Sequence, residues 1–237
     1  MKQTSEFGPR YAGVNELPGR TRANFPEIVD PLFWQVYGNA SRFSLLHVTG
    51  FYNLFQSLNY ISRNRLPGDI VECGCFLGGA GIFMALLRDH LGISDKTIYL
   101  FDSFEGFPKG EEDAMLGKPV KSSRYADTEA DVRDNIAQAA PDCGRIELIR
   151  GFVEQTLPDF RSGMLCLLRL DTDFYNSTKI EFETLYDRLV PGGVLIVDDY
   201  GMFAGSRKAT DEFFAARENL PLLNRIDRGV WAGVKPG

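Results

Sequence analysis

Residues 164–173, Met-Leu-Cys-Leu-Leu-Arg-Leu-Asp-Thr-Asp, are the most informative part of the chain. A short apolar run that begins after Gly163 and ends in acids is typical of a strand buried on both faces, as in a parallel sheet. A second run, Val194-Leu-Ile-Val197, follows Pro191-Gly-Gly193 and ends at Asp198-Asp199. We therefore expect two buried parallel strands, each followed by a pair of carboxylates.

These carboxylates, on Asp171, Asp173, Asp198 and Asp199, predict a cation site. The carboxyl ends of neighbouring strands meet at the crevice where open α/β sheets bind ligands. Four carboxylates gathered there repel one another unless a cation lies between them or some of them take up protons. A hard divalent metal with oxygen ligands is the simplest resolution.

Strands and helices alternate around these two runs. We expect strands at 69–73, 97–101, 146–149, 163–170 and 194–197, and helices at 80–91, 129–140, 177–189 and 206–218. This alternation requires a parallel sheet with right-handed crossovers. Pro191-Gly-Gly193 is expected to end the helix before the last of these strands. The segment 222–235, which turns at Arg228-Gly229, is expected to form an antiparallel hairpin. The fold class is therefore α/β, a mostly parallel seven-stranded sheet with a C-terminal antiparallel hairpin.

The N-terminal part reads differently from the rest. Residues 1–65 are expected to form an irregular arm and a helical extension of two or three helices, since apolar residues recur at helical spacing from Pro31 onward. Residues 66–237 are expected to form the main domain. The segment 107–127 is charged and broken by Gly and Pro, which makes it a candidate lid.

Composition narrows the class of protein. The 237 residues are 44% hydrophobic and 24% charged, as in an ordinary soluble globular protein. A net charge of −6 argues against nucleic acid or an anionic membrane as partner. We expect no secretory leader and no membrane span. The four cysteines lack zinc spacing and fit reduced thiols of a cytoplasmic protein. The N-terminal helices offer an interface for a homo-oligomer.

The loop Glu72-Cys-Gly-Cys-Phe-Leu-Gly-Gly79 lies between an expected strand and helix. Gly74 allows a tight turn, and Gly78 and Gly79 let a ligand approach backbone amides at the helix start. The dinucleotide pattern and the P-loop lysine are both missing. Glu72 would repel a pyrophosphate but pair with a cationic amine or sulfonium, which favours S-adenosylmethionine. A purely structural glycine turn is the alternative.

Asp102 ends the second expected strand, about thirty residues after the glycine loop. An acid there is placed to accept hydrogen bonds from both ribose hydroxyls of an adenosine. Ser103 beside it is included in the predicted donor site, and a loop or capping acid is the alternative for Asp102. Phe152, after the third strand, is a weaker candidate for the adenine ring, because a buried Phe more often belongs to the core.

Five segments of the chain together resemble the macrocin O-methyltransferase family. They are residues 69–79, 101–108, 156–158, 168–178 and 191–200, which occur in the family's order between about residue 66 and the C-terminus. The resemblance implies the class I S-adenosylmethionine-dependent methyltransferase fold and Mg²⁺-dependent methylation of sugar hydroxyls on macrolide and aminocoumarin antibiotics. It also implies that Asp171, Asp198 and Asp199 hold the metal and that Asp173 is the general base.

Four positions depart from the family's usual residues. Leu77 stands where arginine is common and Ala80 where serine is common, next to the expected methyl donor. Thr172 replaces glycine and Asn176 replaces glutamate, and both flank the predicted metal and base. We expect the first two departures to alter donor contacts and the last two to affect the acceptor.

The implied chemistry suits acids at this place. An alcohol is a poor nucleophile while protonated, and a bound divalent cation lowers the pKa of a coordinated oxygen. Fixing the acceptor's orientation supplies roughly 7–11 kcal/mol, and a general base such as Asp173 contributes about 10²–10⁴-fold. Asp171 is expected to support catalysis through the metal. A helix-capping role is the alternative for Asp173.

Other functions fit parts of the pattern. Tyr175-Asn-Ser-Thr-Lys179 has the Tyr-x-x-x-Lys spacing of short-chain dehydrogenases, although it follows a strand end directly. A non-catalytic protein that binds an adenosine ligand is a second alternative, and a catechol methyltransferase is a third. His47 and His90 are expected to be packed or exposed rather than catalytic.

Overall fold

The computed structural model describes residues 19–108, 114–115, 118–119 and 128–237. Its main sheet has seven strands in the order β5-β2-β1-β6-β7-β9-β8. The first five of these are parallel, and β9 runs antiparallel to both β7 and β8, which confirms the predicted sheet and hairpin. The bounds are β1 Asp69–Cys73, β2 Ile98–Asp102, β5 Ile146–Arg150, β6 Leu165–Leu170, β7 Leu189–Val197, β8 Asn224–Arg225 and β9 Trp231–Val234. A separate antiparallel pair joins β3 Ala114–Met115 to β4 Lys118–Pro119.

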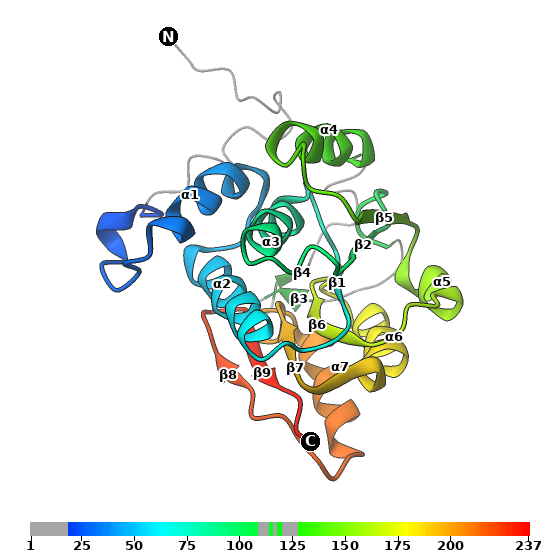
Figure 1. Ribbon diagram of the computed structural model, residues 1–237. Helices are drawn as coiled ribbons and strands as arrows, with labels where there is room; N and C mark the ends of the chain where they lie inside the picture. The colour runs from blue at the N-terminus through cyan, green and yellow to red at the C-terminus, as the bar shows by residue number, and fades with distance from the viewer. Residues whose placement is uncertain (1–18, 109–113, 116–117, 120–127) are drawn as a thin grey trace.

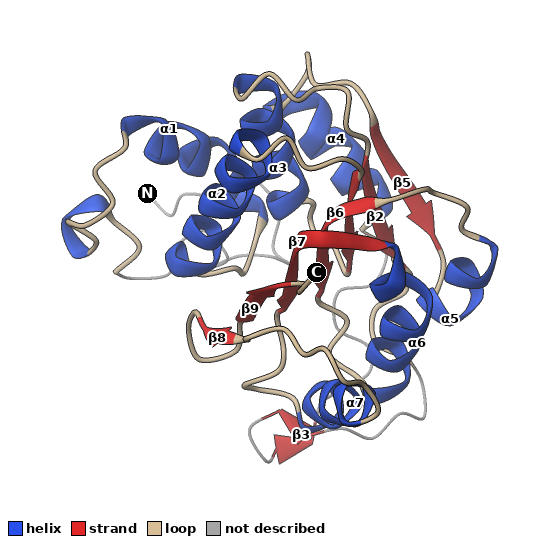
Figure 2. Ribbon diagram, turned by 60° about the horizontal axis from the view of Figure 1, so that its bottom comes forward, coloured by secondary structure: helices blue, strands red, loops and turns tan. Residues whose placement is uncertain are grey.

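Helices cover both faces of the sheet (Figures 1 and 2). On one face lie α1 Pro31–Ala40, α2 Val48–Arg63, α3 Gly79–His90 and α4 Glu129–Ala139; on the other lie α5 Val153–Thr156, α6 Tyr175–Leu185 and α7 Ala204–Ala215. Alternate residues of β7 serve the two layers: Val194 and Ile196 belong to one buried apolar cluster, and Leu195 and Val197 to the other. Each face of the sheet therefore has its own core. No helix in the described ranges has the length and apolar character needed to cross a membrane.

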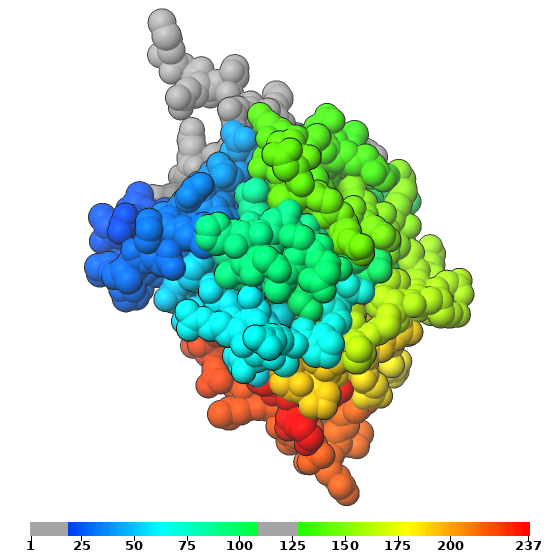
Figure 3. All heavy atoms as spheres, viewed as in Figure 1, coloured from blue at the N-terminus to red at the C-terminus, as the bar shows by residue number. Residues whose placement is uncertain are grey.

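The N-terminal helices share a core with the sheet. Apolar side chains of α2 recur on one stripe and are almost fully buried, as with Phe51, Leu54 and Leu58. Phe33 of α1 makes an edge contact with Phe83 of α3, with ring centroids 6.0 Å apart. Figure 3 shows these helices, blue to cyan, meeting the orange and red C-terminal segment on one side of the molecule. The helical extension thereby borders the sheet's C-terminal hairpin, while the boundary at residue 65 stays a prediction.

The prediction for the segment before β7 was wrong. Helix α6 ends at Leu185 and is followed by a short 3₁₀ turn, Tyr186–Arg188, so Pro191-Gly-Gly193 lies inside β7. The pairing explains this: Leu165 of β6 pairs with Leu189, but Leu167 pairs with Val194, so three extra residues of β7 bulge out. Gly192 has a φ of +82°, which glycine adopts without strain. Most of the candidate lid at 107–127 lies outside the described residues.

Candidate functional site

A cavity of about 670 Å³ opens at the carboxyl ends of the parallel strands. The sheet edge supplies its floor, because strands β1, β2, β6 and β7 all end there. Among the residues predicted from the sequence, those that line the cavity are Glu72, Gly74, Asp102, Ser103, Phe152, Asp171, Asp173, Asp198 and Asp199. The topology therefore brings the predicted donor and metal residues to one place.

Arg169 of β6 is at the centre of this cavity, and the sequence interpretation missed it. Its guanidinium pairs with Glu72 through Nη1, and through Nη2 with Asp171 Oδ2 at 2.7 Å and Asp198 Oδ1 at 2.6 Å. The Arg169 side chain is only 3% exposed. A buried arginine offers donors in a fixed fork that suits several carboxylates at once. The acids are therefore partly neutralised by the protein itself.

The single positive charge of Arg169 does not balance the charge of these acids. Burial raises the pKa of Glu72 to about 7, although Arg169 opposes the shift. Burial, together with the neighbouring acids, also raises the pKa values of Asp171 and Asp199 well above the usual range. These directions mean that the site holds protons tightly when no further positive charge is present. A second cation is the natural competitor for those protons.

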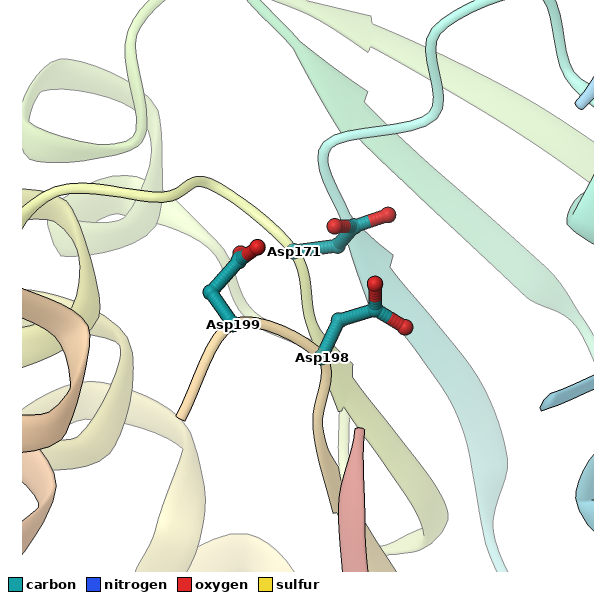
Figure 4. A group of neighbouring side chains, drawn as sticks. All are labelled: Asp171, Asp198 and Asp199. Atoms are coloured by element: carbon teal, nitrogen blue, oxygen red, sulfur yellow. The ribbon is translucent and has the colours of Figure 1, made fainter. Parts of the chain in front are cut away.

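Three of the acids have the donor chemistry of a metal site. One carboxylate oxygen from each of Asp171, Asp198 and Asp199 lies within 4.8 Å of the other two, and the side chains converge from the ends of β6 and β7 (Figure 4). Arg169 forms ion pairs with Asp171 Oδ2 and Asp198 Oδ1. The backbone N–H of Asp173 donates a hydrogen bond to Asp199 Oδ2 at 3.0 Å. Carboxylate oxygens grouped in this way suit a hard cation.

Asp173 lies beside this group in an unusual conformation. Its φ is +70°, in the left-handed region that residues other than glycine seldom adopt. Its side chain lines the cavity, and its backbone N–H is held by Asp199. Strained residues of this kind cluster at functional sites. Phe174, the next residue, provides the N-cap position of α6, so Asp173 is not the capping residue there.

The Asp102 carboxylate is occupied by the protein's own backbone. Oδ2 accepts hydrogen bonds from the N–H groups of Cys75 at 2.9 Å and Phe76 at 3.1 Å, and Oδ1 from that of Phe104 at 2.8 Å. A carboxylate has about four acceptor positions, and backbone N–H groups alone fill three of them. Asp102 therefore fastens the glycine loop to the end of β2, and little capacity is left for two ribose hydroxyls. Ser103 shapes the same loop by donating to the carbonyl of Gly106 at 3.1 Å.

The three predicted glycines have different surroundings. At Gly74, with φ +85°, an added Cβ would lie 1.9 Å from the carbonyl oxygen of Asp171, so the glycine loop and the acid loop touch there. Gly78 and Gly79 do not line the cavity. Gly78 is the left-handed N-cap of α3, and a Cβ on Gly79 would lie 2.6 Å from Cβ of Ser44. Close packing against the N-terminal extension thus explains Gly79.

Another part of the cavity wall comes from two distant parts of the chain. Leu45 and His47 precede α2, and Arg228 lies in the turn of the C-terminal hairpin; all three line the cavity. Thr49 Oγ1 contacts His47 Nδ1 at 2.9 Å and Asp227 Oδ2 at 3.3 Å, which links the two segments. No local motif marks these residues, because they meet only through the fold.

Tyr175 and Lys179, which have the spacing of a dehydrogenase pair, each contact a glutamate outside the cavity. The Tyr175 hydroxyl donates to Glu212 at 2.6 Å, and Lys179 lies 3.9 Å from Glu183 on the same helix. Neither Tyr175 nor Lys179 lines the cavity. Their spacing therefore reflects helix geometry and not a catalytic pair.

A comparison with protein families decides the assignment. The family model described as macrocin-O-methyltransferase (TylF) matches residues 43–233. The chain belongs to the macrocin-O-methyltransferase family. The enzyme is thus an O-methyltransferase of the S-adenosylmethionine type, as the sequence resemblance implied, and the short-chain dehydrogenase alternative is excluded.

Individual relatives agree with this family assignment. The methyltransferase is 33% identical over 199 residues to demethyldecarbamoylnovobiocin O-methyltransferase of Streptomyces niveus, covering 81% of this chain and 76% of that protein. It is 30% identical over 187 residues to mycinamicin III 3''-O-methyltransferase of Micromonospora griseorubida, covering 76% and 73%. The structure of the O-methyltransferase NovP superposes with a TM-score of 0.74 at 28% identity, covering 82% of this chain and 83% of that one. The class I methyltransferase fold is therefore confirmed.

Proposed function

We propose that this enzyme transfers the methyl group of S-adenosylmethionine to a hydroxyl of a sugar, carried on a glycosylated natural product, with the help of a divalent metal. The observation that carries the proposal is the convergence of Asp171, Asp198 and Asp199 inside the cavity of an O-methyltransferase. The names of the relatives support a sugar acceptor: one acts on a rhamnosyl group of a tetracenomycin derivative. A catechol acceptor is the second candidate, since vicinal hydroxyls suit the same acids.

The donor side of the cavity suits a cationic methyl donor. Glu72 Oε1 pairs with Arg169, whereas Glu72 Oε2 is buried without a hydrogen-bond partner among the described residues. A buried acceptor without a donor is costly, so a ligand whose ammonium group donates a hydrogen bond relieves it. Gly74, Ser103 and Phe152 complete the proposed donor site, and Asp102 belongs to it by holding the glycine loop at the end of β2. Gly78 and Gly79 belong to it only as the residues that shape the loop.

The acid group suits Mg²⁺ better than a softer metal, because all of its ligands are carboxylate oxygens. Asp171, Asp198 and Asp199 would hold the ion, and when bound it would supply a positive charge that favours the deprotonated acceptor hydroxyl. Arg169 already contributes one positive charge at the same acids. One divalent ion, and not two, is the expected complement.

Asp173 is the proposed general base. In the reaction, the acceptor oxygen forms a bond to the methyl carbon while the carbon–sulfur bond breaks, and the hydroxyl proton passes to the Asp173 carboxylate. The products are a methyl ether and S-adenosylhomocysteine. The positive φ of Asp173 and the hydrogen bond from its N–H to Asp199 fix the backbone that carries this carboxylate. We expect Asp173→Asn to lower kcat by about 10²–10⁴-fold, as for loss of a general base.

The acceptor is best identified with a panel of compounds. Purified enzyme and isotopically labelled S-adenosylmethionine are incubated with glycosylated macrolides and aminocoumarins, nucleotide sugars and catechols, with Mg²⁺ or with EDTA. The proposal predicts a labelled methyl ether on a sugar, formed only with the metal. A product on catechols alone would shift the assignment to a catechol enzyme. Binding of S-adenosylmethionine with no product from any class would favour the non-catalytic alternative.

A further inference from the structure

Thr172, the middle residue of the Asp171–Asp173 loop, is tied to a buried carboxyl group. Its hydroxyl donates to Glu181 Oε1 at 2.9 Å. Glu181 lies on α6 and is fully buried, with 0% exposure. Its other oxygen, Oε2, is buried and has no hydrogen-bond partner within the described ranges, and the weakly donating thiol of Cys73 lies beside the carboxyl.

Glu181 is an unfavourable residue for ordinary core packing. The buried residues of α6 are Ser177, Thr178, Glu181, Phe182 and Leu185, and Glu181 is the one ionisable side chain among them. A leucine at position 181 would fill similar space without a buried polar atom. Glu181 forms no ion pair with any residue that the structure describes, so its attachment to Thr172 is the polar contact that distinguishes it. That contact leads directly to the catalytic loop.

The loop needs support of this kind. Asp173 is held at φ +70°, which is unfavourable for a residue with a side chain. The carbonyl of Thr172 accepts from the N–H of Phe174 at 2.8 Å, and the N–H of Asp173 donates to Asp199. Thr172 therefore lies between Asp171, the proposed metal ligand, and Asp173, the proposed base, and a contact that holds Thr172 holds the backbone of both. A glycine, which the family commonly has here, offers no hydroxyl for Glu181.

We propose that Glu181 is a positioning residue: through Thr172 it fixes the Asp171–Asp173 loop in the arrangement that methyl transfer requires. The proposal rests on the proposed function of Asp171 and Asp173. It explains one of the departures from the family pattern, because Thr172 and Glu181 act as a pair. In this role Glu181 acts through Thr172 and does not itself contact substrate, cofactor or metal.

The test compares Glu181→Leu, Glu181→Gln, Thr172→Val and the double variant Glu181→Leu/Thr172→Val. We expect kcat to fall about 10- to 100-fold in both Glu181→Leu and Thr172→Val, since small misplacements of reacting groups have effects of this size. The double variant should fall no further than either single variant, because the two residues form one contact. Glu181→Gln keeps an acceptor oxygen and should stay within about threefold of wild type. The KM for S-adenosylmethionine should not change.

Phe182→Leu is the matched control, since Phe182 is buried on the same helix and packs against the rings of Tyr186, Phe213 and Phe214. It should lower the melting temperature and leave kcat unchanged, whereas Glu181→Leu should lower kcat without lowering the melting temperature. Wild-type kcat in Glu181→Leu, multiplicative losses in the double variant, or a kcat loss that follows the melting temperature would each overturn the proposal.

Amide hydrogen exchange at residues 171–174, measured without substrate, separates this proposal from the proposed function. Faster exchange in Glu181→Leu but not in Phe182→Leu supports the positioning role even if no acceptor is methylated. Unchanged exchange in Glu181→Leu contradicts it even if the wild-type enzyme is active.

Discussion

The substitution Arg169→Met removes the guanidinium that pairs with Glu72, Asp171 and Asp198. Removing one partner of a buried ion pair costs about 3–5 kcal/mol, because it leaves an uncompensated charge. Asp171 and Asp198 are 26% and 17% exposed, so water screens part of their loss, whereas Glu72 is 1% exposed. We therefore expect the free energy of unfolding to fall by about 3–4 kcal/mol at pH 8, mostly because of Glu72.

This loss should depend on pH. Burial raises the folded-state pKa of Glu72 to about 7, from an ordinary value of 4.5. Stability linked to a raised pKa is fully present below the unfolded value and is lost as the pH rises through the folded value. Near pH 5 Glu72 is already protonated in the folded wild-type enzyme, so Arg169 has less charge to compensate. The difference between wild type and Arg169→Met should shrink to about 1–2 kcal/mol at pH 5.

Urea unfolding, followed by tryptophan fluorescence and circular dichroism at pH 5 and pH 8, measures both numbers. Arg88→Met is the matched control. Arg88 is also buried. Its guanidinium donates to two carbonyls that do not titrate, those of Lys96 at 2.8 Å and Gly144 at 2.7 Å, and its carboxylate partner, Asp89 at 2.7 Å, is partly exposed, unlike Glu72. The fall in the free energy of unfolding caused by Arg88→Met should be similar at pH 5 and pH 8. An Arg169→Met variant with equal losses at the two pH values, or with less than about 1 kcal/mol at pH 8, would refute the reasoning.

Three further predictions concern the glycine loop, the Asp102 carboxylate and the metal site. Gly74→Ala places a Cβ 1.9 Å from the Asp171 carbonyl oxygen, so we expect about a 100-fold loss of kcat/KM in a methyl-transfer assay. Asp102→Asn weakens the three backbone bonds of the donor loop, and calorimetry should show about tenfold weaker binding of S-adenosylmethionine. Burial raises the pKa values of Asp171 and Asp199, so Mg²⁺ must displace protons: its affinity should fall from pH 8 to pH 6, with proton release seen as a buffer-dependent binding enthalpy. Wild-type activity in Gly74→Ala would contradict the first prediction, and unchanged S-adenosylmethionine affinity in Asp102→Asn the second. A Mg²⁺ affinity that does not depend on pH would contradict the third.

The positions of the main strands and the acid group were predictable because local sequence determines them. Apolar runs that end in Asp171 and Asp198 place these residues at the ends of buried parallel strands, and parallel strands bring their carboxyl ends together. The same reasoning failed for Pro191-Gly-Gly193. Its turn chemistry is real, but the pairing of β7 with β6 absorbs these residues as a bulge, and pairing register is not a local property.

Arg169 could have been found from the sequence, and three other residues of the cavity wall could not. An arginine inside an otherwise apolar run, two residues before an acid, has to meet a counter-charge if the strand is buried. Glu181 gives a similar but weaker signal, as an acid on the buried stripe of α6. Leu45, His47 and Arg228 carry no such signal. They reach the cavity because the N-terminal helices pack next to the C-terminal hairpin, a contact between segments about 180 residues apart.

Direct titration of the metal site tests the central claim most sharply. Mn²⁺ binding, followed by electron paramagnetic resonance at pH 8, should give one ion per chain in the wild-type enzyme. The variant Asp198→Asn should lose that site, and methyl transfer should disappear with it and with EDTA. Methyl transfer that persists in EDTA, or an unchanged Mn²⁺ stoichiometry in Asp198→Asn, would contradict the account.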